Sequence, residues 1–233
     1  MPTKIKESVQ RRYAHIALTE TSCCAPSSCC GTSTDTVAEG DLGLGCGLPT
    51  TFADLRAGET VLDLGSGAGV DVFRAAREVG LEGRVIGVDM TPEMIARARH
   101  NAEAGSYANV EFRLGDIEHL PVDDGSVDVV LSNCVINLVP DKRQVFDEIH
   151  RVLREGGRFV VSDIVTVGDV PREVRSDPDL WAGCLAGALD RSDYLEIIRG
   201  AGFVDIDVVA ESSWQQPEAG FTTESITVSA RKG

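Results

Sequence analysis

The stretch Val61–Val70, reading VLDLGSGAGV, decides the fold. Its first part, Val61–Leu64, is a short apolar run with one acid in it, which is typical of a strand in the interior of a parallel sheet. Glycines then follow at alternate positions, Gly65, Gly67 and Gly69. Glycine lets the backbone turn sharply after a strand and lets a ligand approach the backbone closely. The stretch therefore predicts a strand followed by a ligand-binding turn.

On the C-terminal side of this stretch the chain alternates between strand and helix patterns. Further strands are predicted at residues 84–89, 109–116, 126–133 and 158–164, and helices at 71–79, from 92 onward and at 142–154. Thr91 and Pro92 form a helix start, with threonine as N-cap and proline at the first helical position. Such alternation predicts an α/β fold: a Rossmann-like, doubly wound, mostly parallel sheet with helices on both faces. Residues 203–212 and 224–232 are expected to add an antiparallel hairpin at the edge of the sheet.

We expect the chain to have four parts. They are a Cys-rich N-terminal arm at 1–40, a ligand-binding Rossmann-like core at 41–165, a capping insert at 166–200 and C-terminal strands at 201–233 that complete the sheet. Within the arm, residues 1–20 are expected to be amphipathic or loosely ordered and residues 21–40 to be loop. The insert breaks the alternation with prolines and the mostly apolar run WAGCLAGAL (181–189). We interpret it as a helical cap over the strand ends.

Composition narrows the class of protein. The 233 residues carry a formal net charge of −15, which argues against a nucleic-acid partner because phosphate binding needs a basic face. The sequence contains neither an apolar run of the roughly 18 residues that a membrane span needs nor a recognisable signal peptide, so a cytoplasmic protein without a membrane partner is expected. Seven cysteines are then unusual. In a reducing compartment they should be thiols, which favours metal, metalloid or redox chemistry over a disulfide framework.

Acids close three successive predicted strands. Asp63, Asp89 and Asp116 each stand at or beside a strand end, at the carboxyl edge where open α/β sheets bind ligands. Asp63 before the glycines disfavours a pyrophosphate and suits a ligand with an ammonium group. Asp89 is placed to accept hydrogen bonds from ribose hydroxyls. Asp116 is placed to meet an adenine amino group.

The pattern D-x-G-x-G-x-G followed by two further acids resembles the class I S-adenosylmethionine methyltransferases, over about residues 55–165. The resemblance implies S-adenosylmethionine as cofactor, with Asp63 and Gly65 near its methionine part and Met90 against the adenine ring. The implied cofactor-binding residues are Asp63, Gly65, Ser66, Gly67, Gly69, Asp89, Met90, Asp116 and Ile117. A glycine-rich turn of another Rossmann protein, such as a nicotinamide enzyme, is the alternative.

Three cysteines lie where they can reach the strand ends. Cys134 directly follows the fourth strand in SNCVINL, Cys46 stands between glycines that leave its thiol accessible, and Cys184 lies in the insert. Soft thiolates select soft ions such as Cu(I) or Zn(II), and by the same logic trivalent arsenic. We therefore expect a three-thiol site, with Val135 and Ile136 as candidates for the wall of an apolar pocket.

The motifs LGCG, DLGSGAGVD, GVDMTPEMI, GDIEHLP, SNCVINLVPDK and CLAGAL together resemble the arsenite methyltransferase family, from about Gly40 to Leu189. The resemblance implies Cys46, Cys134 and Cys184 as the catalytic, arsenic-binding thiols. It also implies arsenite or methylated trivalent arsenicals as substrates, a thiol reductant such as thioredoxin or glutathione, and a role in arsenic detoxification. A monomer is expected.

Four further cysteines form two vicinal pairs in the N-terminal arm. They are Cys23, Cys24, Cys29 and Cys30. Adjacent cysteines fit a tetrahedral zinc site poorly. Three interpretations stay open: capture or delivery of arsenic, a redox partner for Cys46, or no defined role.

Two other functions compete with arsenic methylation. One is a methyltransferase for a carbon or oxygen acceptor on a small molecule, in which the cysteines are incidental. The other is a non-catalytic metalloid-binding or redox-sensing protein, which the vicinal pairs support and the intact glycine loop opposes. The four histidines are interpreted as structural or surface residues: His15, His100, His119 and His150.

Overall fold

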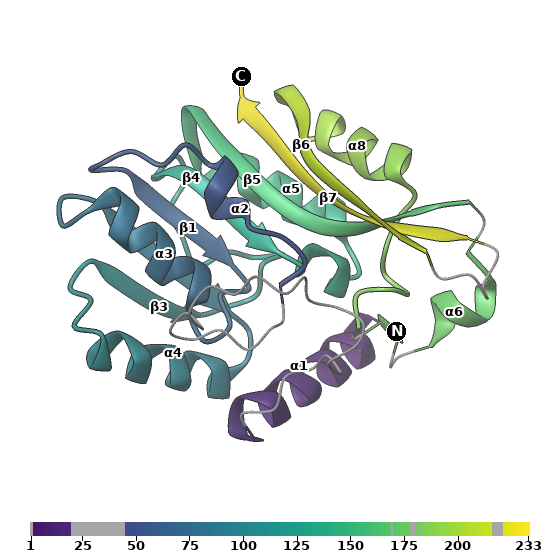
Figure 1. The fold of residues 1–233 in the computed structure, drawn as a ribbon, viewed down its shortest axis with the longest axis horizontal. Helices are drawn as coiled ribbons and strands as arrows, with labels where there is room; N and C mark the ends of the chain where they lie inside the picture. Colours follow the sequence, from purple (N-terminus) through teal and green to yellow (C-terminus); the bar gives the residue numbers. More distant parts are fainter. Residues whose placement is uncertain (1, 20–44, 169, 178–179, 182, 216–220) are drawn as a thin grey trace.

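The computed structural model describes residues 2–19, 45–168, 170–177, 180–181, 183–215 and 221–233. These residues form a seven-stranded sheet in the order β3-β2-β1-β4-β5-β7-β6 (Figure 1). The strands are β1 (Thr60–Leu64), β2 (Arg84–Asp89), β3 (Val110–Leu114), β4 (Val127–Asn133), β5 (Leu153–Val167), β6 (Phe203–Gln215) and β7 (Thr222–Lys232). The first five strands pair in parallel, and β7 and β6 add antiparallel pairs at the edge. The predicted fold class is confirmed.

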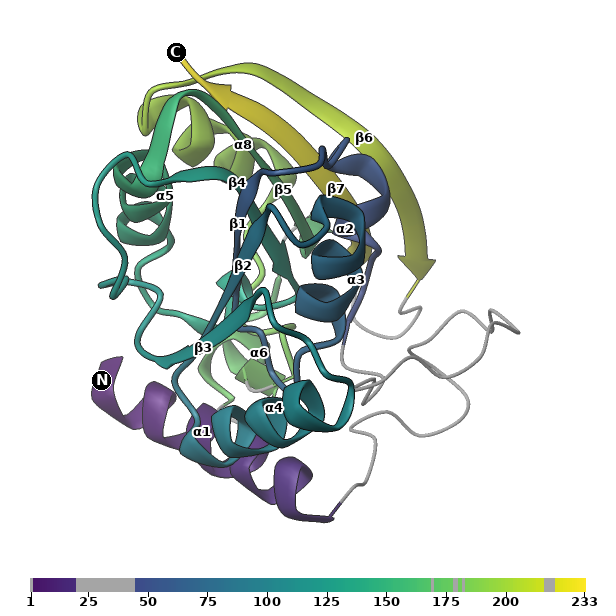
Figure 2. The same ribbon diagram turned by 90° about the vertical axis from the view of Figure 1, so that its left-hand side faces the viewer.

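Helices cover both faces of the sheet, with α2, α3 and α4 on one face and α5 and α8 on the other (Figure 2). The helices are α1 (Pro2–Thr19), α2 (Pro49–Phe52), α3 (Val70–Val79), α4 (Pro92–Ala104), α5 (Lys142–Val152), α6 (Arg172–Ser176) and α8 (Arg191–Gly200), with a 3₁₀ turn η1 (Ile136–Leu138). Thr91 is the N-cap of α4 and Pro92 its first residue, as predicted, although the threonine side chain makes no capping hydrogen bond.

The periodicity of the helices explains this layering. In α3, Phe73, Ala76 and Val79 lie on one face and are buried against β1 and β2. In α5, Val145 and Ile149 lie on one face and are fully buried on the opposite side of the sheet. The central strands are apolar on both faces, which is what a parallel sheet covered by two helical layers requires.

The boundary between α5 and β5 differs from the predicted one. We expected the helix to reach residue 154, but α5 ends at Val152 and the strand begins at Leu153. Leu153 pairs with Val127 of β4, so strand pairing takes over from helical periodicity. Gly156, at φ = 70°, lies inside the strand.

The predicted arm and the predicted insert both contain helices. Residues 2–19 form the single helix α1, which packs beside α4 below the sheet (Figures 1 and 2). The insert at 166–200 contains α6, with 5 residues, and α8, with 10 residues, and turns cover residues 183–187 between them. Among the helices in the described ranges, none is long and apolar enough to cross a bilayer.

An ion-pair cluster joins β2 to β3 on the surface. Glu111 of β3 accepts hydrogen bonds from Arg113, at 2.7 Å, and from Arg84 of β2. The hydrogen bond from Arg113, together with that from Arg84, lowers the pKa of Glu111 to about 2. Because the pKa is lower in the folded state, this stabilisation is present above the usual glutamate pKa and is lost as the pH falls toward 2.

We therefore predict that Glu111→Gln destabilises the protein at pH 7 by about 1 kcal/mol or less, since the cluster is partly exposed. Urea unfolding at pH 7 and at pH 3.5 measures the effect. The difference from the wild type should shrink at the lower pH, and Glu82→Gln, at an exposed glutamate outside the cluster, should cause no such change. A difference that is constant with pH would contradict this account.

Candidate active site

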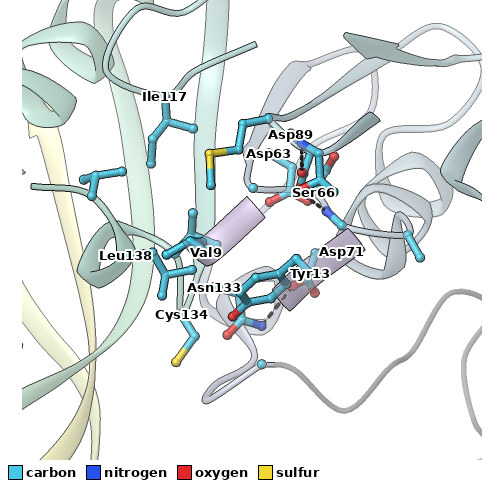
Figure 3. A pocket seen from close by; sticks show the side chains of 18 of the residues that line it. Val9, Tyr13, Asp63, Ser66, Asp71, Asp89, Ile117, Asn133, Cys134 and Leu138 are labelled. Carbon is cyan, nitrogen blue, oxygen red and sulfur yellow. Dashed lines mark hydrogen bonds between the residues drawn. The ribbon is translucent and has the colours of Figure 1, made fainter. Parts of the chain in front are cut away.

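A pocket lies at the carboxyl ends of β1, β2 and β4, beneath α1 (Figure 3). The sheet places polar groups on its floor: Asp63 from β1, Asp89 from β2 and Asn133 from β4. Parallel pairing of β1 with both β2 and β4 aligns these ends at one edge. The pocket is therefore where the sequence predicted a ligand.

The glycine loop shapes one side of this pocket. Gly65 has φ = 64°, and a Cβ there would lie 2.5 Å from the Val135 side chain. Gly67 donates its N–H to Asp89 Oδ2 at 3.0 Å. Gly69, at φ = 101°, is the N-cap of α3 and faces the ring of Phe73, so it is not among the pocket-lining residues. Of the nine predicted cofactor residues, the other eight line the pocket.

Carboxyl groups make up much of the polar lining of the pocket. Burial raises the pKa of Asp63 well above its usual value, and the neighbouring carboxyls of Asp71 and Asp89 raise it further. Burial also raises the pKa of Asp89, although N–H groups of Thr91 and Gly67 act in the opposite direction. Three carboxyl groups so close together destabilise one another's charge. A cationic ligand would relieve this repulsion, so the site suits a molecule with ammonium and sulfonium groups.

A buried hydroxyl supports the same conclusion. Ser66 in the glycine loop is 4% exposed, and its Oγ has no hydrogen-bond partner among the described residues. A buried polar atom without a partner is costly, which indicates that a ligand supplies the missing hydrogen bond. Together with the glycine loop and the carboxyl groups, Ser66 fits S-adenosylmethionine.

The residues expected at the adenine end line the pocket and also contact α1. Met90 and Ile117 are lining residues, and the Met90 carbonyl accepts a hydrogen bond from Gln10 of α1 at 3.0 Å. Asp116 Oδ2 accepts a hydrogen bond from Lys6 Nζ, which also pairs with Glu118. The carboxylate expected to meet an adenine amino group therefore already holds a cation of α1.

Helix α1 adds lining residues that the sequence analysis missed. Val9 is 1% exposed, and its side chain and that of Tyr13 line the pocket (Figure 3). The apolar residues Ile5, Val9 and Ile16 recur at helical spacing, which was the available signal. It predicted an amphipathic arm but not the surface against which that arm packs.

The structure brings the three expected thiols together, but not as three free thiols. Cys46 and Cys134 form a disulfide, with Cα atoms 5.7 Å apart. Cys184 is buried and forms no disulfide, and its Sγ donates to the Cys134 carbonyl at 3.2 Å. In the described ranges, no three His, Cys, Asp or Glu side chains are arranged to hold a metal ion. The expected three-thiol site thus requires the disulfide to be reduced first.

The segment around Cys46 is held by Asn133 at the end of β4. Asn133 Oδ1 accepts from the N–H of Cys46 at 3.0 Å and of Gly47 at 3.2 Å. A Cβ at Gly45 would lie 2.6 Å from the Asn133 amide, and one at Gly47 would lie 2.5 Å from Ser162 Oγ. The flanking glycines therefore allow this close approach, a role that the sequence analysis did not foresee.

Two of the cysteines have unusual backbone conformations. Cys134 has φ = 59° and Cys184 has φ = 66°, in the left-handed region that costs a non-glycine residue about 1–3 kcal/mol. Surrounding hydrogen bonds hold Cys134 in place, since its N–H donates to the Ser162 carbonyl at 2.8 Å. Strain of this kind concentrates at functional sites.

The thiols lie in a small apolar cluster apart from the main cores. Buried Val9, Leu138, Cys134 and Cys184 pack together, with Tyr13, Met90 and Trp181 around them. Val135 lines the pocket, as expected for its wall. Ile136 does not: it is fully buried in the core beneath α5, because η1 turns its side chain inward.

The remaining predictions concern the N-terminal cysteines and the histidines. Cys23, Cys24, Cys29 and Cys30 lie outside the described residues. His150 packs against the ring of Phe203, with centroids 5.3 Å apart, which agrees with a structural role.

The sheet order, the glycine loop and the acidic pocket at the strand ends define a class I, S-adenosylmethionine-dependent methyltransferase. A family model described as a methyltransferase domain matches residues 55–202. The Halobacterium salinarum protein named arsenite methyltransferase is 46% identical, over 99% of this chain and 67% of its own length. The human protein of the same name is 42% identical, over 61% of this chain and 40% of its own. The chain belongs to the arsenite methyltransferase family.

A solved structure agrees with this assignment. The arsenic(III) S-adenosylmethionine methyltransferase from Chlamydomonas reinhardtii has a TM-score of 0.73 and 40% identity, over 79% of this chain and 66% of that one. The chain thus spans about two-thirds or less of the length of these relatives.

We predict that Asp89→Asn weakens the binding of S-adenosylmethionine by about 10–100-fold, because hydrogen bonds to a charged acceptor are worth roughly 1.5–3 kcal/mol. Calorimetric titration measures the dissociation constant. Asp123→Asn, at an exposed acid outside the pocket, is the control and should bind normally. Equal affinity in Asp89→Asn and the wild type would contradict the role of Asp89.

Proposed function

We propose that the protein transfers methyl groups from S-adenosylmethionine to thiolate-bound trivalent arsenic. One observation carries the proposal: Cys134, joined to Cys46 and touched by Cys184, lines the same pocket as Asp63 and Asp89. The names of the relatives from Halobacterium, human and Chlamydomonas support arsenic as the methyl acceptor. Because these relatives are longer than the chain, its own activity and substrates are part of the proposal.

The chain supplies the groups that hold the cofactor. Asp63 would face its cationic end, and Asp89 would accept hydrogen bonds from the ribose hydroxyls, with Ser66 as a donor nearby. Met90, Ile117 and Asp116 would hold the adenine. When bound, S-adenosylmethionine supplies an electrophilic methyl group. Val9 and Tyr13 of α1 cover the pocket and exclude water, which favours the loss of positive charge during transfer.

The thiols bind the substrate. Reduction of the Cys46–Cys134 disulfide by a dithiol or by two molecules of a monothiol gives two cysteine thiols and one oxidised reductant disulfide. Arsenite then exchanges hydroxide ligands for Cys134 and Cys184, releasing water, with Cys46 as a third or transient ligand. Thioredoxin or glutathione is the expected reductant.

The chemistry of transfer makes few demands on acid–base groups. Trivalent arsenic carries a lone pair and no proton, so a general base is not required. Because that lone pair forms the new As–C bond, the arsenic becomes formally pentavalent, and two thiols return the two electrons by closing a disulfide, which the reductant then opens again. The main task of the protein is alignment, which can contribute about 7–11 kcal/mol to lowering a barrier. The rigid ends of β1 and β4 on which Asp63 and Cys134 stand support this role.

The wider setting follows from the same chemistry. We place the protein in the reducing cytoplasm as a monomer that serves arsenic detoxification, since free thiols are needed in each cycle. Residues 166–200 form the substrate-capping part, between the core at 41–165 and the C-terminal strands at 201–233. The arm at 1–40 covers the cofactor through α1. Arsenite and methylated trivalent arsenicals are the proposed substrates.

We predict that the reduced protein, given arsenite, S-adenosylmethionine and a thiol reductant, forms methylated arsenic that mass spectrometry detects. Cys134→Ser and Cys184→Ser should each lower the rate by about 100-fold or more, because soft arsenic loses a thiolate ligand. As the control, both variants should keep the affinity of the wild type for S-adenosylmethionine. Full activity in either variant would rule out that thiol as a ligand, and activity only toward a carbon or oxygen acceptor would overturn the proposal.

A further inference from the structure

The loops that carry Cys134 and Cys184 pack directly against each other. Besides the contact of the Cys184 thiol with the Cys134 carbonyl, Trp181 Nε1 donates to the Leu138 carbonyl of η1 at 3.2 Å. A Cβ at Gly187 would lie 2.0 Å from the Asn137 carbonyl oxygen, so the two backbones meet without room for a methyl group. The distance between the two thiols therefore depends on how η1 meets the turn that contains Cys184.

Lys142 contacts both of these loops. It is the first residue of α5 and is 5% exposed. Its Nζ donates to the carbonyl of Val139, at 3.1 Å, and more weakly to that of Asn137, at 3.5 Å, on the Cys134 side. The same ammonium lies 5.7 Å from the centroid of the Trp181 ring, on the Cys184 side. One buried cation thus bridges the two thiol-bearing loops.

Asp163 of β5 is the acidic partner of this arrangement, and burial raises its pKa to about 7. It is 1% exposed, and its Oδ2 accepts from the Tyr194 hydroxyl at 3.1 Å. The backbone of Asn137 also acts to lower the pKa of this carboxyl, so η1 lies between the carboxyl of Asp163 and the ammonium of Lys142. Burial lowers the pKa of Lys142 to about 8, while the neighbouring carboxyl of Asp163 acts to raise it.

Burying an ammonium group is costly, and an apolar side chain in its place is often as stable. Lys142 does not line the cofactor pocket, so cofactor binding does not account for it. Its contacts are instead with the two loops whose separation sets the geometry of the thiols. We infer that Lys142 is a positioning residue that holds the Cys184 turn against η1, so that Cys134 and Cys184 bind one trivalent arsenic together. This inference rests on the proposed function of the thiols.

The test uses a full-length protein in which the other five cysteines are serine, so that only Cys134 and Cys184 remain. The probe is phenylarsine oxide, which condenses with two thiols to give one arsenic bound to both sulfurs and one water. Its dissociation constant is measured after reduction, and S-adenosylmethionine affinity reports that the rest of the fold is intact. This readout is independent of methyl transfer.

Lys142→Met in this two-thiol protein should weaken phenylarsine oxide binding by about tenfold or more, because a desolvated cation–π contact and two hydrogen bonds are lost. Arg143→Met, at the next, exposed position of α5, is the matched control and should bind as the parent does. With Cys184→Ser as well, Lys142→Met should have no further effect, because the two changes act on the same contact.

Unchanged affinity in Lys142→Met would overturn the inference, as would an equal loss with and without Cys184. If Lys142→Met loses S-adenosylmethionine binding, Trp181→Leu is used in its place, because it breaks the same bridge from the other loop. Trp181→Leu should weaken the binding of phenylarsine oxide by the same factor. Normal binding of the probe in this variant would overturn the inference. If binding of the probe to the two-thiol protein depends on Lys142 but the wild type does not methylate arsenite, only the proposed function is disproved.

Discussion

The site depends on one constraint, the parallel pairing of β4 between β1 and β5. Leu64 pairs with Ser132, so the glycine loop after β1 and Asn133-Cys134 after β4 emerge side by side. On its other edge Asn133 pairs with Ser162, whose carbonyl accepts the N–H of Cys134. One strand end thus lies next to both the methyl-donor pocket and the thiols. If this register shifted by one residue, Cys134 would point to the other face of the sheet.

Local sequence patterns predicted the site residues that lie at the ends of strands. Asp63 and Asp89 were predictable because a strand, its apolar run and its last residue are all local features, and parallel pairing then brings the strand ends together. Cys134 was predictable as a strand-end residue for the same reason. The elements around 84–89 and 126–133 agree closely with β2 and β4, since buried parallel strands have strong sequence patterns.

The remaining features depend on tertiary packing that no local pattern carries. Tyr13 reaches the pocket, and Lys6 reaches Asp116, only because α1 docks beside α4, and an amphipathic helix does not specify its partner. Lys142 resembles an ordinary first-turn lysine until η1 and the Cys184 turn are seen around it. The disulfide joins Cys46 to Cys134, which is 88 residues away in sequence. The sequence therefore predicted two thiols near the strand ends but not the bond between them.

The central claim is that arsenic binds at Cys134 and Cys184 beside the methyl-donor pocket. Arsenic K-edge X-ray absorption of the reduced, arsenite-loaded protein tests it most directly. With Cys23, Cys24, Cys29 and Cys30 replaced by serine, arsenic should have a shell of sulfur ligands that loses one sulfur in Cys134→Ser and one in Cys184→Ser. An arsenic shell with the same number of sulfurs in both variants as in their parent would contradict the account.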